Sequence, residues 1–101
     1  MISLLKKLFQ KNNPPLEQII QNGAVIVDVR TAQEYKQGHV QGSKNIPLNE
    51  IKLKLEQVRK WNKPVITVCR SGNRSSMAKG ILKAAGIEVY NGGAWTNLKT
   101  K

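Results

Sequence analysis

Short runs of apolar, β-branched residues recur along the chain and predict buried strands. Residues 24–27 (Ala-Val-Ile-Val) and 65–68 (Val-Ile-Thr-Val) form two such runs, and residues 87–90 (Ile-Glu-Val-Tyr) form a third. A continuous apolar run of this length is typical of a strand buried on both faces, which favours a parallel sheet. Residues 45–47 can add only a very short strand, because Pro47 has no N–H to donate to a ladder.

The segments between these runs have helical patterns. The predicted helices are a segment that starts near Leu16 and stops at Asn22-Gly23, a segment that begins at Thr31–Glu34, and residues 50–61, 75–85 and 94–98. Thr31 and Glu34 match a capping box, and Gly86 ends the fourth helix. In that fourth helix we expect Met77, Ile81 and Ala84 or Ala85 to face the core. Strands that alternate with helices predict a three-layer α/β domain.

The chain divides into two parts at Asn12-Asn13-Pro14-Pro15. Residues 1–13 are predicted to be an amphipathic extension, with Leu4, Leu5, Leu8 and Phe9 on one face, and residues 14–101 are predicted to be the domain. The extension is interpreted as a frayed end or a helix packed on the domain. The alternative is a weak contact with an anionic membrane or a partner protein.

Composition narrows the class of protein. The 101 residues suit one domain, and the single cysteine excludes an internal disulfide framework. One histidine beside one cysteine argues against a dedicated zinc site, so we predict neither a metal nor a cofactor. No apolar run reaches the ~18 residues of a membrane span. Lysines interrupt the N-terminal apolar segment before a signal peptide can form, and we expect a cytoplasmic protein.

The candidate site is the loop that follows the second predicted strand. Cys69 stands directly after that strand and before a helix, where ligands bind in open parallel sheets. Gly72 permits a tight turn, and Ser71 and Asn73 keep the loop slim. Inward-pointing amides and the helix N-terminus would stabilise an anion at this point. We therefore expect Cys69 to ionise readily.

Arg70 and Arg74 place cations in the same loop. Together with the amides they would lower the pKa of Cys69, hold a sulfur-bearing anion for attack by the thiolate, and then stabilise the negative outer sulfur of a persulfide. The alternative interpretation is a buried structural cysteine, which is common in proteins. The position at a strand–loop boundary beside two arginines argues against it.

The charge distribution also favours an anionic substrate. The chain carries 17 Lys+Arg against 6 Asp+Glu, a net charge of +11, and has no carboxylate between Gln57 and Ile87. Like-signed charge concentrates anions around a pocket, although most of these lysines can also be interpreted as ordinary solvated surface. Nucleic-acid binding is a weaker alternative, because aromatic residues are only 5% and no RNA or DNA motif is present. A basic sulfur carrier that contacts tRNA for its thiolation would combine both interpretations.

Several other polar residues are interpreted as structural. Asp28 and Arg30 follow the first predicted strand, where Asp28 would brace the loop rather than act as an acid or base, or Arg30 would pair with Glu34. His39 has no second histidine near it and is expected to be a hydrogen-bonding structural residue. Trp61 and Trp95 are expected to be packing residues.

Four segments in register resemble the rhodanese family, the single-domain sulfurtransferases. They are Val27-Asp28-Val29-Arg30, the stretch from Glu34-Tyr35 through Gly38-His39-Val40 to Asn45-Ile46-Pro47, the loop Val68-Cys69-Arg70-Ser71-Gly72-Asn73-Arg74-Ser75, and Gly92-Gly93-Ala94-Trp95. The resemblance covers roughly residues 16–98 and implies a parallel five-stranded sheet flanked by helices. It implies sulfane-sulfur transfer from a small anionic donor such as thiosulfate, through a persulfide on Cys69, to cyanide, a thiol or a protein acceptor.

Two further alternatives follow from the resemblance. Related phosphatases and arsenate reductases have five residues between cysteine and arginine, whereas here four residues separate Cys69 from Arg74. The shorter loop suits a sulfur atom and crowds a phosphoryl group, so that reaction is disfavoured. A non-catalytic module that binds a partner protein is the other alternative, but such modules usually lose the cysteine or its loop, and both are present here.

Overall fold

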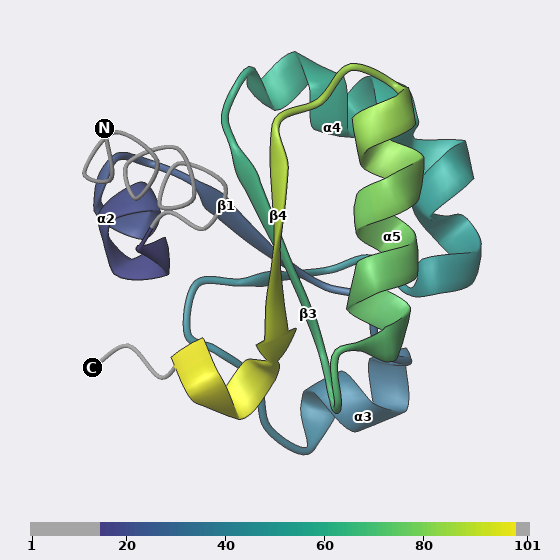
Figure 1. Ribbon diagram of the computed structural model, residues 1–101. Coiled ribbons are helices and arrows are strands. Elements are labelled where there is room, and N and C mark those ends of the chain that lie inside the picture. Colours follow the sequence, from purple (N-terminus) through teal and green to yellow (C-terminus); the bar gives the residue numbers. More distant parts are fainter. Residues whose placement is uncertain (1–14, 99–101) are drawn as a thin grey trace, which may run out of the picture.

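The computed structural model describes residues 15–98, which form a parallel sheet with helices on both faces (Figure 1). The strands are β1 (Val25–Asp28), β2 (Lys44–Asn45), β3 (Val65–Cys69) and β4 (Val89–Ala94), in the order β2-β1-β3-β4. The predicted three-layer α/β architecture is confirmed, but within the described residues the sheet has four strands rather than the implied five. The predicted N-terminal extension lies outside the described residues.

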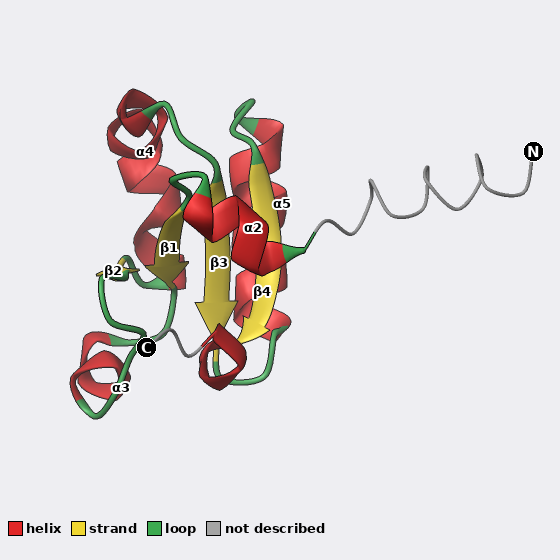
Figure 2. Cartoon of the chain, turned by 90° about the vertical axis from the view of Figure 1, so that its left-hand side faces the viewer, coloured by secondary structure: helices red, strands yellow, loops and turns green. Residues whose placement is uncertain are grey.

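The helices cover the two faces of the sheet unequally. They are α2 (Leu16–Gln21), α3 (Ala32–Lys36), η1 (Leu48–Lys54), α4 (Leu55–Trp61), α5 (Asn73–Ala84) and η2 (Trp95–Leu98), where η marks a 3₁₀-helix. Figure 2 shows α2 on one side of the sheet and α4 and α5 on the other. No helix in the described part of the chain is long and apolar enough to cross a membrane.

Successive residues of β3 supply the cores on opposite faces. Val65 and Cys69 belong to the larger core, which is closed by Val58 of α4 and by Leu82 of α5. Ile66 and Val68 belong to a smaller core beneath α2 and η2. Alternation along a strand places these two sets on different faces, so β3 is buried from both sides, as its apolar run predicts.

Two helices differ from their predicted form. Residues 50–61 were expected to form one helix, but the chain makes 3₁₀ turns through η1 before α4 begins. In α5 the buried residues are Ser75, Ala78 and Leu82, whereas Met77 is 61% exposed, so its predicted inward orientation is wrong. Hydrogen bonds turn the Ser75 side chain toward the sheet, and a residue two positions later then faces the opposite way.

β4 runs further than its sequence pattern predicts. It continues through Gly92 and Gly93, which were expected to form a turn, and its register with β3 shifts between Thr67 and Val68. Gly92 packs directly against β3, since a Cβ there would lie 2.8 Å from Ile66 Cγ2 and 2.9 Å from Val68 Cγ1. Gly92 therefore allows close contact between the strands, and β4 continues through both glycines instead of ending there.

Candidate active site

The candidate site lies where the central strands end. Cys69 is the last residue of β3, and α5 begins four residues later at Asn73. Asp28, the last residue of β1, pairs in register with Val68, so the ends of the two strands are adjacent. Figure 1 shows α3 and the start of α5 at this same end of the sheet. The fold therefore brings both predicted segments, residues 28–30 and 69–74, to one edge.

Backbone amides of the loop point at the sulfur of Cys69. The Gly72 N–H donates to Cys69 Sγ at 2.9 Å, and the Ser75 N–H donates at 3.3 Å. The thiol in turn donates to Ser75 Oγ at 3.4 Å. Gly72 has φ +103°, a left-handed conformation that glycine adopts readily and that turns its amide inward. The side chain of Cys69 is buried, with 1% of the residue exposed.

These contacts control the ionisation of the thiol. Burial raises the pKa of Cys69, but hydrogen bonds from the Ser75 hydroxyl and from the amides of Ser75, Gly72 and Ser71 outweigh burial and lower the pKa below its usual value. The thiolate is the nucleophilic form of cysteine, so the arrangement can support attack on an electrophilic sulfur. The hydroxyl and amide dipoles close to Sγ are the main groups that stabilise the thiolate.

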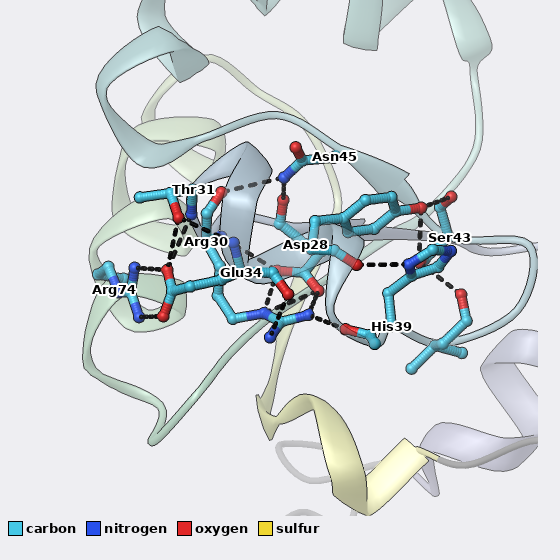
Figure 3. Close-up of polar contacts among 11 residues, drawn as sticks. Asp28, Arg30, Thr31, Glu34, His39, Ser43, Asn45 and Arg74 are labelled. Atoms are coloured by element: carbon cyan, nitrogen blue, oxygen red, sulfur yellow. Dashed lines mark hydrogen bonds and ion pairs between the residues drawn. The ribbon is translucent and has the colours of Figure 1, made fainter.

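The guanidinium of Arg74 forms an ion pair with the carboxylate of Glu34. Its Nη1 and Nη2 atoms lie 2.7 and 3.1 Å from the carboxylate oxygens of Glu34 in α3 (Figure 3). Hydrogen bonds from Arg74, and then from the backbone of Thr31, lower the pKa of Glu34 to about 2. The Arg74 guanidinium thus joins the start of α5 to α3, and its charge also interacts with that of Cys69. Its expected role in binding the substrate anion stays a prediction.

Arg30 is paired with Asp28. Its Nε atom is 2.9 Å from Asp28 Oδ1, and its Nη2 atom is 2.7 Å from Asp28 Oδ2, with both side chains buried. Arg30 also donates to the carbonyl oxygen of Gly38 and lies 4.6 Å from the ring centroid of Trp95. The suggested pairing with the Glu34 carboxylate is wrong, because Arg30 reaches only the backbone oxygen of that residue.

The capping box and the histidine have local partners. Thr31 accepts from the Glu34 amide and donates its own amide to the Glu34 carboxylate, so the predicted capping box is confirmed. His39 Nδ1 is 2.7 Å from the carbonyl oxygen of Tyr35, and the two rings stack at 3.7 Å. His39 is thus placed as the structural residue that the sequence predicts.

A cleft of about 310 Å³ borders the loop. It is lined by Arg30, Glu34, Gln37, Gly38, Arg70 and Trp95. Arg70 is exposed, and its guanidinium makes no ion pair or side-chain hydrogen bond with the described residues. Because Arg30 and Arg74 are occupied by carboxylates, Arg70 is the loop cation that remains available to an anion. No group of three or more His, Cys, Asp or Glu residues in the described region could hold a metal ion.

Two residues of the site were missed by the sequence analysis. Ser75 was placed only as the first residue of a helix, yet it is fully buried and contacts the sulfur through both amide and hydroxyl. Asn91 lies on β4, and its Oδ1 atom is 2.7 Å from Ser75 Oγ. A serine at the start of the helix after Cys69 is a signal that could have been used. Asn91 gave none, because its position depends on how far β4 extends.

Comparison with known proteins agrees with this geometry. The Rhodanese-like domain profile matches residues 12–97. The chain is 42% identical over 69 residues to the thiosulfate sulfurtransferase PspE of Escherichia coli, covering 66% of each protein. It is 38% identical over 69 residues to the uncharacterised protein YqhL of Bacillus subtilis, covering 67% of this chain and 54% of that protein. The matches thus span about half to two thirds of these relatives.

A solved structure gives the same result. The structure of a rhodanese with anions from E. coli superposes with a TM-score of 0.70 at 36% identity, covering 78% of this chain and 95% of that one. The superposition of the two structures extends over most of the described fold. With the profile match over most of its length and the shared parallel sheet, the chain belongs to the rhodanese-like domain family.

Proposed function

We propose that this protein is a sulfurtransferase that carries sulfane sulfur as a persulfide on Cys69. The observation that carries the proposal is the convergence of the Gly72 and Ser75 amides on Cys69 Sγ, at the start of a helix. The name of the relative PspE, thiosulfate sulfurtransferase, supports thiosulfate as a donor. The family resemblance and the four-residue spacing from Cys69 to Arg74 favour sulfur over phosphoryl transfer.

The reaction consists of two displacements at sulfur. The Cys69 thiolate attacks the outer sulfur of thiosulfate, the sulfur–sulfur bond of the donor breaks, and sulfite leaves with the bonding electron pair. The charge of the resulting persulfide resides on its outer sulfur. An acceptor such as cyanide or a thiolate then attacks that outer sulfur, and Cys69 leaves as the thiolate. No external oxidant or reductant is needed.

Residues around the loop have different parts in this scheme. The loop 70–74 supplies amides for the sulfur anion, and Arg70 attracts the anionic donor because its charge is not neutralised by a described carboxylate. Asp28 and Arg30 brace the adjacent strand end, and the Glu34–Arg74 pair holds the far end of the loop. Both pairs hold the strand end and the loop in position, and the charge of Arg74 also interacts with that of Cys69.

Intact mass spectrometry tests the proposal directly. Purified protein is reduced, incubated with thiosulfate and separated from excess reagent, and its intact mass is then measured. We expect the mass to increase by one sulfur atom, to return to its original value after cyanide, and to stay constant in Cys69→Ser. Absence of the gain in the reduced wild-type protein would rule out persulfide formation from thiosulfate and favour a partner-binding module. Repeating the incubation with a protein persulfide donor separates a narrow donor range from an inactive site.

A further inference from the structure

Hydrogen bonds link Cys69, Ser75 and Asn91, and the donor and acceptor of each bond can be assigned. Asn91 sits on β4 opposite Thr67, and the register shift after it places Gly93, rather than Gly92, opposite Val68. This irregularity allows the Gly93 N–H to reach Asn91 Oδ1 at 2.9 Å. The same oxygen lies 2.7 Å from Ser75 Oγ. A backbone N–H can only donate, so the side-chain atom of Asn91 that faces it is the carbonyl oxygen.

The orientation of the Asn91 amide determines where the proton of the Ser75 hydroxyl points. Because Asn91 Oδ1 cannot donate, the Ser75 hydroxyl must be the donor in their 2.7 Å contact. The amide nitrogen of Asn91 correspondingly faces the carbonyl oxygen of Gly72, at 3.4 Å. The one proton of the Ser75 hydroxyl has two acceptors in reach, Asn91 Oδ1 and, further away at 3.1 Å, the carbonyl oxygen of Gly72. With that proton on the shorter contact, Ser75 presents a lone pair to Cys69 Sγ, which donates its own proton to it. Cys69 therefore donates to Ser75, and Ser75 donates to Asn91.

We propose that Asn91 is a positioning residue that acts through Ser75. It draws the Ser75 proton away from Cys69, so that the uncharged form of Sγ is favoured over the thiolate. When Cys69 ionises, Sγ competes for one hydroxyl proton with Asn91 Oδ1 and with the more distant Gly72 carbonyl oxygen. In a persulfide the charge lies on the outer sulfur, so Sγ competes less for the hydroxyl proton and Ser75 can again donate to Asn91 Oδ1. This consequence for the persulfide rests on the proposed function, and it means that Asn91 helps to drive sulfur onto the enzyme.

The charged groups nearby do not compete for this role. Arg70 and Arg74 belong to the loop that carries Cys69, and Arg74 is paired with Glu34 of α3. Asp28 at the end of β1 is paired with Arg30. None of them is hydrogen-bonded to Asn91 or Ser75, so a change at Asn91 leaves both ion pairs in place.

The pKa of Cys69, measured from thiolate absorbance or from the pH profile of iodoacetamide alkylation, tests the proposal. We expect Asn91→Ala to lower this pKa by about one unit, because Ser75 then loses its nearest acceptor and the thiolate competes for the hydroxyl proton only with the more distant Gly72 carbonyl oxygen. Asn91→Asp keeps the acceptor, adds negative charge and should raise the pKa. In a Ser75→Ala background, Asn91→Ala should have no effect on the pKa. Thermal unfolding of each variant establishes that it is folded.

The pKa shifts of these variants either support or contradict the role of Asn91. Shifts in the same direction for Asn91→Ala and Asn91→Asp, or a shift from Asn91→Ala that persists without the Ser75 hydroxyl, would overturn the role assigned to Asn91. If Asn91→Ala does not fold, the near-isosteric Asn91→Asp is decisive, and an unchanged or lowered pKa rejects the proposal. These measurements use the free thiol, so they remain informative if thiosulfate yields no persulfide.

Discussion

At the scale of single residues, the site is defined by which charges are already paired. Sequence reasoning placed Cys69, Arg70 and Arg74 in one loop, but it could not predict that a carboxylate from a distant helix would occupy Arg74. The partners Glu34 and Arg74 are forty positions apart, and no local pattern encodes such a contact. Arg70 is left as the available cation, while amide dipoles stabilise the sulfur.

The Glu34–Arg74 pair gives the folded protein an acid-sensitive contribution to stability. The pKa of Glu34 is about 2 in the folded protein instead of its ordinary 4.5. The carboxylate therefore favours the folded state fully above pH 4.5, and this gain disappears as the pH falls towards 2. We expect about 1 kcal/mol for a pair that is about a third exposed and screened by solvent. Glu34→Gln should lower the free energy of unfolding at pH 7 and flatten its decline between pH 5 and pH 2.

Urea unfolding over this pH range measures the effect, and Glu17→Gln is the matched control. Glu17 makes no ion pair or side-chain hydrogen bond within the described residues and should change the profile little. An unaltered pH dependence in Glu34→Gln would show that its charge is not coupled to folding.

At the scale of elements, local signals were predictable and packing-dependent ones were not. The apolar runs located β1 and β3, and the Thr31–Glu34 pattern located the start of α3, because both depend on neighbours in the chain. The extent of β4 depends on Gly92 fitting against β3, which a sequence does not display. The exposure of Met77 likewise follows from the bonds that rotate Ser75 inward.

The start of α5 makes a prediction that compares two glycines. Gly72 precedes the helix at φ +103°, where any Cβ is strained, whereas Gly80 is an ordinary helical residue with open space where a Cβ would lie. Gly72→Ala should reduce the free energy of unfolding by about 1–2 kcal/mol and raise the pKa of Cys69, because the strained turn moves the Gly72 amide away from Sγ. Gly80→Ala should increase the free energy of unfolding by up to about 1 kcal/mol.

Denaturant unfolding and thiol titration of both variants check this pair. Equal changes in stability for Gly72→Ala and Gly80→Ala would contradict a special conformation at Gly72. A loss of stability without any change in the pKa of Cys69 would contradict the contribution of its amide to the thiolate.

At the scale of the whole molecule, a net charge of +11 surrounds a buried thiol. Three of the six carboxylates are engaged with Arg30, Arg59 and Arg74, so within the described region the positive field comes largely from lysines and Arg70. Such a field raises the local concentration of anions and their rate of encounter with the site. Sequence composition predicted this property well, because net charge depends on residue counts rather than on contacts.

Alkylation of Cys69 by two reagents of similar size separates this field from the accessibility of the sulfur. Iodoacetate is an anion and iodoacetamide is neutral, and both must reach a residue that is 1% exposed, so their rate ratio cancels the cost of access. Raising the ionic strength from about 0.01 to 0.15 M shortens the screening length from about 30 to 8 Å. The iodoacetate rate should fall about threefold or more while the iodoacetamide rate stays nearly constant. Parallel salt dependence of the two reagents would show that the positive surface does not guide anions to Cys69, and the preference for an anionic donor would then depend on the loop alone.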